Sequence, residues 1–177
     1  NPTGGWVGRR EMELFLEQIP PEILVVVDQA YAEFAAAAGV EDYPDLIEEL
    51  HRPNLLLLRT FSKLYGLAGL RIGYAMGHPS LIQTLYKVKQ PFNLGSLSQV
   101  AAIAAIDDTA HQKKTLDVVR TGLNTLLAAF NRWGWTALPT AANFIAVRPN
   151  QGSAEQFVQD LEKRGVILRW LKSFGME

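Results

Sequence analysis

A lysine, two hydroxyl residues and an arginine lie close together after a short apolar run. Residues 55–58 are all leucine, and the polar side chains that follow them include Thr60, Ser62 and Lys63. Arg71 comes a little further along the chain. A lysine amine can form a Schiff base with an aldehyde, while hydroxyls and a guanidinium can bind a phosphate. The combination indicates an aldehyde cofactor that also carries a phosphate, as pyridoxal phosphate (PLP) does.

A carboxylate and a phenol follow a second apolar run. Residues 23–27 are aliphatic, Asp28 ends the run, and Tyr31 lies just beyond. Ligands of open α/β sheets bind at the carboxyl ends of the strands, so we expect Asp28 to face such a ligand. There it could hold a protonated pyridine nitrogen, and the Tyr31 phenol could hydrogen-bond a ring hydroxyl. Taken alone, Asp28 could equally be a helix cap or a surface carboxylate, and Tyr31 a packing residue.

The elements that position these residues follow from the hydrophobic pattern. The run 23–27 is typical of a strand buried on both faces. Further strands are predicted at 55–58, 71–76, 135–138, 144–147 and 166–171. Helical spacing predicts helices at 9–18, 79–89, 96–107, about 110–132 and 154–164. Ser96 or Ser98 would cap the third of these helices.

This order of elements predicts an α/β fold. Residues 1–108 alternate strand and helix around a parallel or mixed sheet, and residues 109–177 form a long helix and a smaller α+β unit. We therefore expect part of a large ligand-binding domain followed by part of a small domain. The pair Asn143-Phe144 at the start of a small-domain strand is a candidate substrate contact.

The composition excludes several classes of function. The 177 residues are 48% hydrophobic and 20% charged with a net charge of −1, which allows a real core but gives no electrostatic case for nucleic acid or an anionic membrane. No apolar run is long enough to span a membrane. Cysteine is absent, which fits a cytoplasmic protein, and the three histidines lack metal-ligand spacing, so we expect no metal site. The chain opens without Met, so we interpret it as an internal piece of a longer protein.

Four motifs, in this order, resemble the fold-type I PLP-dependent aminotransferases of class I/II. They are Asn1-Pro2-Thr3-Gly4, Asp28-Gln29-Ala30-Tyr31, Ser62-Lys63 and Arg71. Within that group, the segments 25–34, 60–74 and 90–93 are most similar to histidinol-phosphate aminotransferases. Gln29 and Gly95 depart from the usual pattern of that family, in which Glu and Asn stand at these positions.

The resemblance implies a role for each matched residue. Lys63 would hold PLP and then carry the proton between the substrate α-carbon and the cofactor. Asp28 would pair with the pyridine nitrogen, and Asn1 and Tyr31 would hydrogen-bond the cofactor O3′. The cofactor phosphate would be bound by Thr60, Ser62 and Arg71.

The resemblance also implies substrates and partners. L-histidinol phosphate would be the amino donor and 2-oxoglutarate the 2-oxo acid acceptor, in histidine biosynthesis. The full-length protein would be a homodimer, and the arginine that binds the substrate carboxylate would follow Glu177. We expect the chain by itself to be inactive.

Other functions remain open on the sequence. An aromatic or broad-range aminotransferase, or a threonine-phosphate decarboxylase, could carry every motif named above. A non-catalytic sensor or structural domain could also have kept this fold. The presence of both Lys63 and Asp28 favours an enzyme over such a domain.

Overall fold

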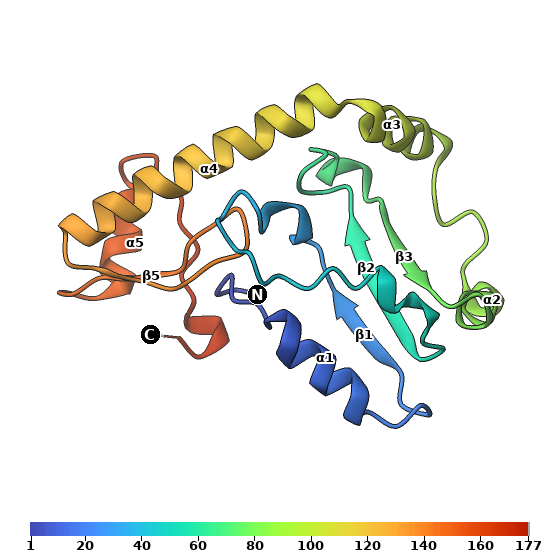
Figure 1. The fold of residues 1–177 in the computed structure, drawn as a ribbon. Helices are drawn as coiled ribbons and strands as arrows, with labels where there is room; N and C mark the ends of the chain where they lie inside the picture. Colours follow the sequence, from blue (N-terminus) through green and yellow to red (C-terminus); the bar gives the residue numbers. More distant parts are fainter. Residues whose placement is uncertain (177) are drawn as a thin grey trace.

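A mixed sheet of three strands forms the first part of the fold (Figure 1). The computed structural model describes residues 1–176. Strand β1 (Val25–Asp28) pairs in parallel with β2 (Leu55–Thr60), and β2 pairs in antiparallel fashion with β3 (Gly73–Gly77). Because β1 and β2 run the same way, their carboxyl ends lie at one edge of the sheet.

One face of this sheet carries the main core. Helix α1 (Arg9–Gln18) was expected from its pattern and packs Leu16 against this face. Leu55 and Leu57 are fully buried there, because side chains alternate along a strand and these two point the same way. The core is therefore built from α1, β1, β2 and the connection between the strands.

The other face of β1 is open. Val26 is 50% exposed, and Ile23 and Leu24 lie before the strand and are also half exposed. The prediction of a strand buried on both faces is therefore wrong in the part of the chain that the structure describes. Helix α1 packs on one side only, and the aliphatic run cannot by itself specify how many sides are covered.

An irregular connection joins β1 to β2, as the Ala-rich and acidic composition suggests. It contains two short 3-10 turns, η1 (Ala32–Phe34) and η2 (Glu48–His51). Phe34 and Leu46 anchor this connection because both side chains are almost completely buried. The connection lies directly after Asp28 and so shapes the surroundings of that carboxylate.

Three helices follow β3, and all three were predicted. They are α2 (Pro79–Val88), α3 (Ser96–Asp107) and α4 (Thr109–Arg132). Asp108 caps α4 by accepting a hydrogen bond from the backbone N–H of His111. The serine cap predicted for α3 does not form: Gly95 is the N-cap residue, and the Ser98 hydroxyl donates to the Leu70 carbonyl instead.

Helix α4 connects the first sheet to a small second one (Figure 1). Strands β4 (Thr136–Ala137) and β5 (Val147–Arg148) are antiparallel, and α5 (Ala154–Glu162) follows them. β4 is shorter than the predicted strand, and β5 begins three residues later than predicted, so Phe144 lies in the loop before it. The strand predicted at 166–171 is wrong. Ile167 is 85% exposed, and no neighbouring strand among residues 1–176 pairs with this segment. An apolar run without a hydrogen-bonding partner does not make a strand.

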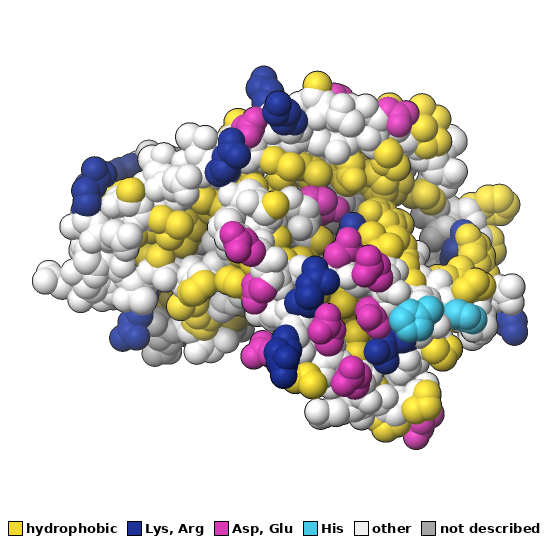
Figure 2. Space-filling model, in the orientation of Figure 1, with side chains coloured by type: hydrophobic (Ala, Val, Ile, Leu, Met, Phe, Trp, Pro, Cys, Tyr) yellow, Lys and Arg dark blue, Asp and Glu magenta, His cyan; other side chains and the backbone are white. Residues whose placement is uncertain are grey.

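Apolar side chains also remain on the surface, as Figure 2 shows for one face. Around α2 and α3 the exposed ones include Tyr86, Val88, Phe92, Leu97, Val100 and Ile103. None of the helices described in residues 1–176 combines the length and apolar character that a membrane crossing needs.

The buried sheet face gives the first prediction. Replacing Leu57 by Ala leaves a cavity among close-packed side chains, so we expect the free energy of unfolding to fall by about 2–5 kcal/mol. Urea denaturation measures this change. Val26→Ala, on the half-exposed face of the neighbouring strand, is the control and should cost clearly less. Equal losses would contradict the placement of the core.

Candidate active site

The carboxyl edge of the parallel strand pair holds the first predicted site residue. Asp28 is the last residue of β1 and lies opposite Leu58 of β2. The backbone N–H of Gln29 donates to the Leu58 carbonyl at 2.9 Å and continues the pairing by one bond. Asp28 is exposed at this edge, where a ligand could reach its carboxylate.

The Asp28 carboxylate also sets the direction of the chain. Its Oδ1 accepts a hydrogen bond of 2.9 Å from the backbone N–H of Ala30. This Asx turn lets an aspartate replace a backbone group in turning the chain. The turn ends the strand and leads directly to Tyr31.

Two residues that are far from Tyr31 in the sequence contact it. The Lys63 Nζ lies 5.1 Å from the centroid of the Tyr31 ring, within the range of a cation–π contact. The Asn1 side-chain amide donates a hydrogen bond of 3.3 Å to the Tyr31 hydroxyl. The fold therefore brings an amine, a phenol and an amide together beyond the ends of β1 and β2.

The hydroxyl residues lie at the end of β2. The Thr60 Oγ1 accepts a hydrogen bond of 3.0 Å from the backbone N–H of Ser62. This bond turns the chain out of the strand and leads into Lys63. Thr60 lies inside the strand, since β2 extends two residues beyond the predicted end at Leu58.

The pairing of β2 with β3 places Arg71 close in the chain to a residue that lies opposite Thr60. Gly73, two residues after Arg71, lies opposite Thr60 in the register of β2 and β3. Arg71 has the left-handed backbone angle φ of 50°, and its Nη1 donates to the Ala68 carbonyl at 2.8 Å. Among the described contacts none joins Arg71 to Lys63 or Tyr31. A guanidinium has five N–H donors, so this single bond leaves donors for an anion.

Phe144 is a neighbour of Tyr31 whose position the sequence did not indicate. The two ring centroids are 5.4 Å apart and the rings are nearly perpendicular, at 78°. We expected the Asn143-Phe144 pair to touch the substrate. The structure packs Phe144 edge-to-face on Tyr31 and leaves Asn143 exposed, and the substrate contact stays a prediction.

A buried polar cluster, formed by Gln29 and Arg59, supports the segment that follows Asp28. Gln29 is 1% exposed, and its amide donates to the Pro44 carbonyl at 3.0 Å and accepts from the Arg59 Nη2 at 3.3 Å. Arg59 also lies 3.8 Å from the Asp45 carboxylate. These bonds tie the connection between the strands to the residue that follows Asp28. The sequence signal was weak: one polar residue directly after Asp28.

Burial alters the acidity of two residues beside this cluster. Burial raises the pKa of the Glu33 carboxyl, and a backbone hydrogen bond and the Arg59 charge oppose that shift. Burial likewise raises the pKa of the Tyr43 phenol, which the positive charge of Arg59 opposes. Both groups are therefore biased toward their neutral forms.

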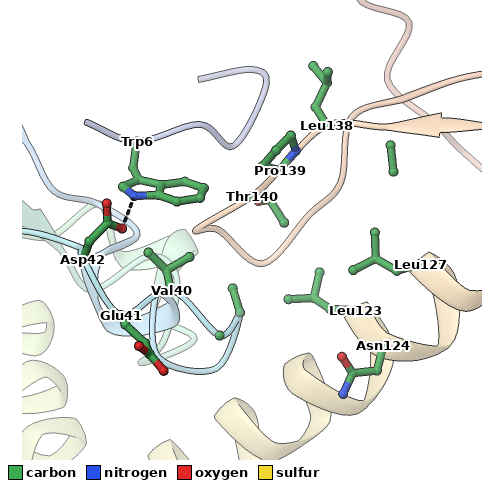
Figure 3. Close-up of a pocket in the computed structure, with 13 residues that line it drawn as sticks. Trp6, Val40, Glu41, Asp42, Leu123, Asn124, Leu127, Leu138, Pro139 and Thr140 are labelled. Carbon is green, nitrogen blue, oxygen red and sulfur yellow. Dashed lines mark hydrogen bonds between the residues drawn. The ribbon is translucent and has the colours of Figure 1, made fainter. Parts of the chain in front are cut away.

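A cavity of about 500 Å³ lies elsewhere, between the N-terminal segment, the connection after η1 and helix α4 (Figure 3). The Trp6 indole N–H donates to the Asp42 carboxylate at 2.8 Å on its wall. No predicted site residue lines this cavity. The predicted site is instead an open edge of the sheet.

Comparison with known proteins identifies the family. The model of the aminotransferase class I and II family matches residues 1–177, and the chain belongs to this family. Similar relatives include histidinol-phosphate aminotransferases from Moorella thermoacetica, 45% identical, and Carboxydothermus hydrogenoformans, 42% identical. Both matches cover 100% of this chain but only 45% and 48% of the relatives. The chain thus spans about half the length of these relatives.

Solved structures agree on the fold. The histidinol-phosphate aminotransferase from Sinorhizobium meliloti, solved with pyridoxal-5′-phosphate, matches with a TM-score of 0.85 and 31% identity, over 96% of this chain and 46% of that one. The L-threonine-O-3-phosphate decarboxylase from Porphyromonas gingivalis matches with a TM-score of 0.77 and 24% identity, over 96% of this chain and 51% of that one, and shows the fold alone. The predicted α/β fold of this enzyme class is confirmed.

Glu33 gives a prediction about pH. Its folded pKa is raised above the unfolded value, so folding disfavours the ionised carboxylate. The associated stability is present in full below the unfolded pKa of about 4.3 and is lost as the pH rises through the folded pKa. We therefore expect the unsubstituted chain to gain stability relative to Glu33→Gln when the pH falls from 7 towards 4, because a carboxyl whose pKa is raised by folding binds its proton more tightly in the folded state.

Thermal unfolding of both proteins across this pH range measures the gain. Glu13→Gln, on the exposed side of α1, controls for the loss of one negative charge. A stability difference that does not change with pH would contradict the role of burial at Glu33.

Proposed function

We propose that this chain carries the cofactor-binding centre of a PLP-dependent aminotransferase. The observation that carries the proposal is the meeting of Lys63, Tyr31 and Asn1 beyond the carboxyl ends of β1 and β2. Membership of the aminotransferase class I and II family supports it, as does the PLP bound to the relative from Sinorhizobium meliloti.

The chemistry of the side chains at this edge fits the cofactor. PLP presents an aldehyde, a ring nitrogen, a ring hydroxyl and a phosphate, and when bound it supplies an electron sink for the substrate. An amine suits the aldehyde, a carboxylate suits the protonated nitrogen, and a phenol and an amide suit the ring oxygen. Hydroxyls and a guanidinium suit the phosphate. The chain supplies each of these groups, in Lys63, Asp28, Tyr31, Asn1, Thr60, Ser62 and Arg71.

Each residue then has a defined task. Lys63 would hold the cofactor until the substrate amine displaces its Nζ. The freed Nζ would then carry the proton from the substrate α-carbon to the cofactor, and in the opposite direction in the second half of the reaction. The Asp28 carboxylate keeps a proton on the ring nitrogen by accepting its hydrogen bond. Tyr31 and Asn1 orient the ring through its oxygen. Anchoring of the phosphate is shared by Thr60, Ser62 and Arg71.

The relatives support a particular substrate pair. The relatives from Moorella thermoacetica and Carboxydothermus hydrogenoformans are both named histidinol-phosphate aminotransferases. We therefore propose that the full-length protein transfers the amino group of L-histidinol phosphate to 2-oxoglutarate in histidine biosynthesis. We also propose a cytoplasmic homodimer, with residues 1–108 in the large domain and residues 109–177 in an inter-domain helix and the small domain.

The role of Lys63 is tested by its removal. In the full-length protein, Lys63→Ala should lower turnover by at least about 10³-fold, because it removes both the covalent anchor and the proton carrier. The absorption band of the bound cofactor should shift as well. Lys87→Ala, on the exposed surface of α2, is the matched control. Near-normal turnover by Lys63→Ala would contradict the proposed role of Lys63.

The substrate is tested by competition between donors. We expect the full-length protein to use L-histidinol phosphate with a kcat/KM at least about tenfold above that for phenylalanine, the gain of roughly one charge-assisted phosphate contact. Release of carbon dioxide from threonine phosphate would identify a decarboxylase instead. Equal use of phenylalanine would indicate an aromatic or broad-range aminotransferase.

A further inference from the structure

We propose that Phe144 and Thr140, on the loop between β4 and β5, are positioning residues that hold the Tyr31 phenol in place for the cofactor. The proposal rests on the proposed function, because Tyr31 needs a fixed orientation only if it hydrogen-bonds a bound ring. Neither residue offers an acid or base of its own to the reaction. Both would act through Tyr31.

Tyr31 is held on several sides by residues from distant parts of the chain. The Phe144 ring meets it edge-on at 5.4 Å, Lys63 lies over its ring at 5.1 Å, and Asn1 donates to its hydroxyl at 3.3 Å. Edge-to-face packing is the geometry that aromatic pairs prefer, because the positive ring edge meets the negative face. The Phe144 contact therefore restricts how the Tyr31 ring can tilt.

Thr140 builds the loop that presents Phe144. Its Oγ1 donates to the Phe144 carbonyl at 2.8 Å and accepts from the backbone N–H of Ala142 at 3.0 Å. One hydroxyl thus closes the loop at two points, on either side of Asn143. Ala141 and Ala142 are 3% and 2% exposed, so the burial of these two residues also holds the loop in place. The carbonyl bonded to Thr140 belongs to the residue whose ring touches Tyr31.

The same loop anchors the segment that begins with Asn1. The backbone N–H of Ala141 donates to the Gly4 carbonyl at 2.8 Å. Gly4 is buried with φ of +84°, and a Cβ there would collide with the Thr140 side chain. Only glycine fits at such an approach. The loop at 140–144 therefore organises both restraints on Tyr31: its ring through Phe144, and its hydroxyl through the segment from Gly4 to Asn1.

This arrangement gives Phe144, which has no polar group, a way to affect cofactor binding. A hydrogen bond weakens steeply when its angle deviates, so a phenol that tilts loses its bond to the ring oxygen. Phe144 and the loop restrict that tilt through their contact with the Tyr31 ring. The expected consequence is a change in the properties of the bound cofactor when Phe144 loses its ring.

The contact is tested first without cofactor. In the full-length protein with ¹³C-labelled tyrosine, the NMR signal that disappears in Tyr31→Phe is assigned to Tyr31. Phe144→Leu and Thr140→Val should both shift this signal. Thr140→Ser, which keeps the hydroxyl, should restore the signal. Phe157→Leu is the matched control, because Phe157 packs edge-on against Trp135 at 4.9 Å. If the Tyr31 signal does not change in Phe144→Leu, the contact between Phe144 and Tyr31 is absent and the proposal is wrong.

The positioning role is tested with cofactor. Phe144→Leu should weaken PLP binding by roughly two- to tenfold, the equilibrium factor of one aromatic edge contact, and should shift the pH midpoint of the cofactor's absorption band. In a Tyr31→Phe background the same substitution should no longer move that midpoint, because it acts through the phenol. Phe157→Leu should change neither property.

The two proposals fail in different ways. A Phe144→Leu shift of equal size with and without the Tyr31 hydroxyl overturns the positioning role, even if the protein is an active aminotransferase. Absence of any cofactor band in the unsubstituted full-length protein overturns the proposed function, and with it the reason to orient Tyr31. In that case the tyrosine signal still decides whether the Phe144 contact exists.

Discussion

The parallel pairing of β1 with β2 is the constraint on which the candidate site depends. Parallel strands end at the same edge, so Asp28, at the end of one strand, and the turn that leads to Lys63, after the other, share one neighbourhood. In an antiparallel pair these two groups would lie at opposite ends. The fully buried Leu55 and Leu57 pack β2 against the core formed with α1 and β1.

Tyr31 is the point where the separate parts of the chain are joined at the site. It receives contacts from the first residue of the chain, from the turn after β2 and from the loop between β4 and β5. Each of these contacts is weak by itself, on the order of 1 kcal/mol. Together they link the second sheet to the edge of the first, so the small sheet can influence the chemistry of residues that it does not contain.

The buried cluster of Gln29 and Arg59 has a different task. Gln29 bonds at once to the Pro44 carbonyl and to the Arg59 guanidinium, and so it fixes the connection that passes behind Asp28. A glutamate at this position would have no amide N–H to donate to Pro44. The choice of an amide therefore bears on how the carboxyl edge is supported. The raised pKa of Glu33 reflects the same buried surroundings.

The sequence by itself determined which side chains make up the candidate site, and it determined most of the helices. Lys63, Asp28 and Tyr31 follow apolar runs whose length and composition favour strands, and α1 to α4 have helical spacing with clear ends. These features are local, because a few neighbouring residues decide them. The sequence also indicated the family through four motifs in a fixed order, and the family is confirmed over the whole chain.

Only the tertiary structure decided what covers each surface and which distant residues meet. The aliphatic run of β1 is buried on one face because α1 packs on one side only, and residues 166–171 form no strand because no partner lies beside them among the described residues. The approach of Gly4 to Thr140 and of Phe144 to Tyr31 joins segments that are far apart in the sequence. No local pattern encodes such contacts, since they arise only when the whole chain has folded.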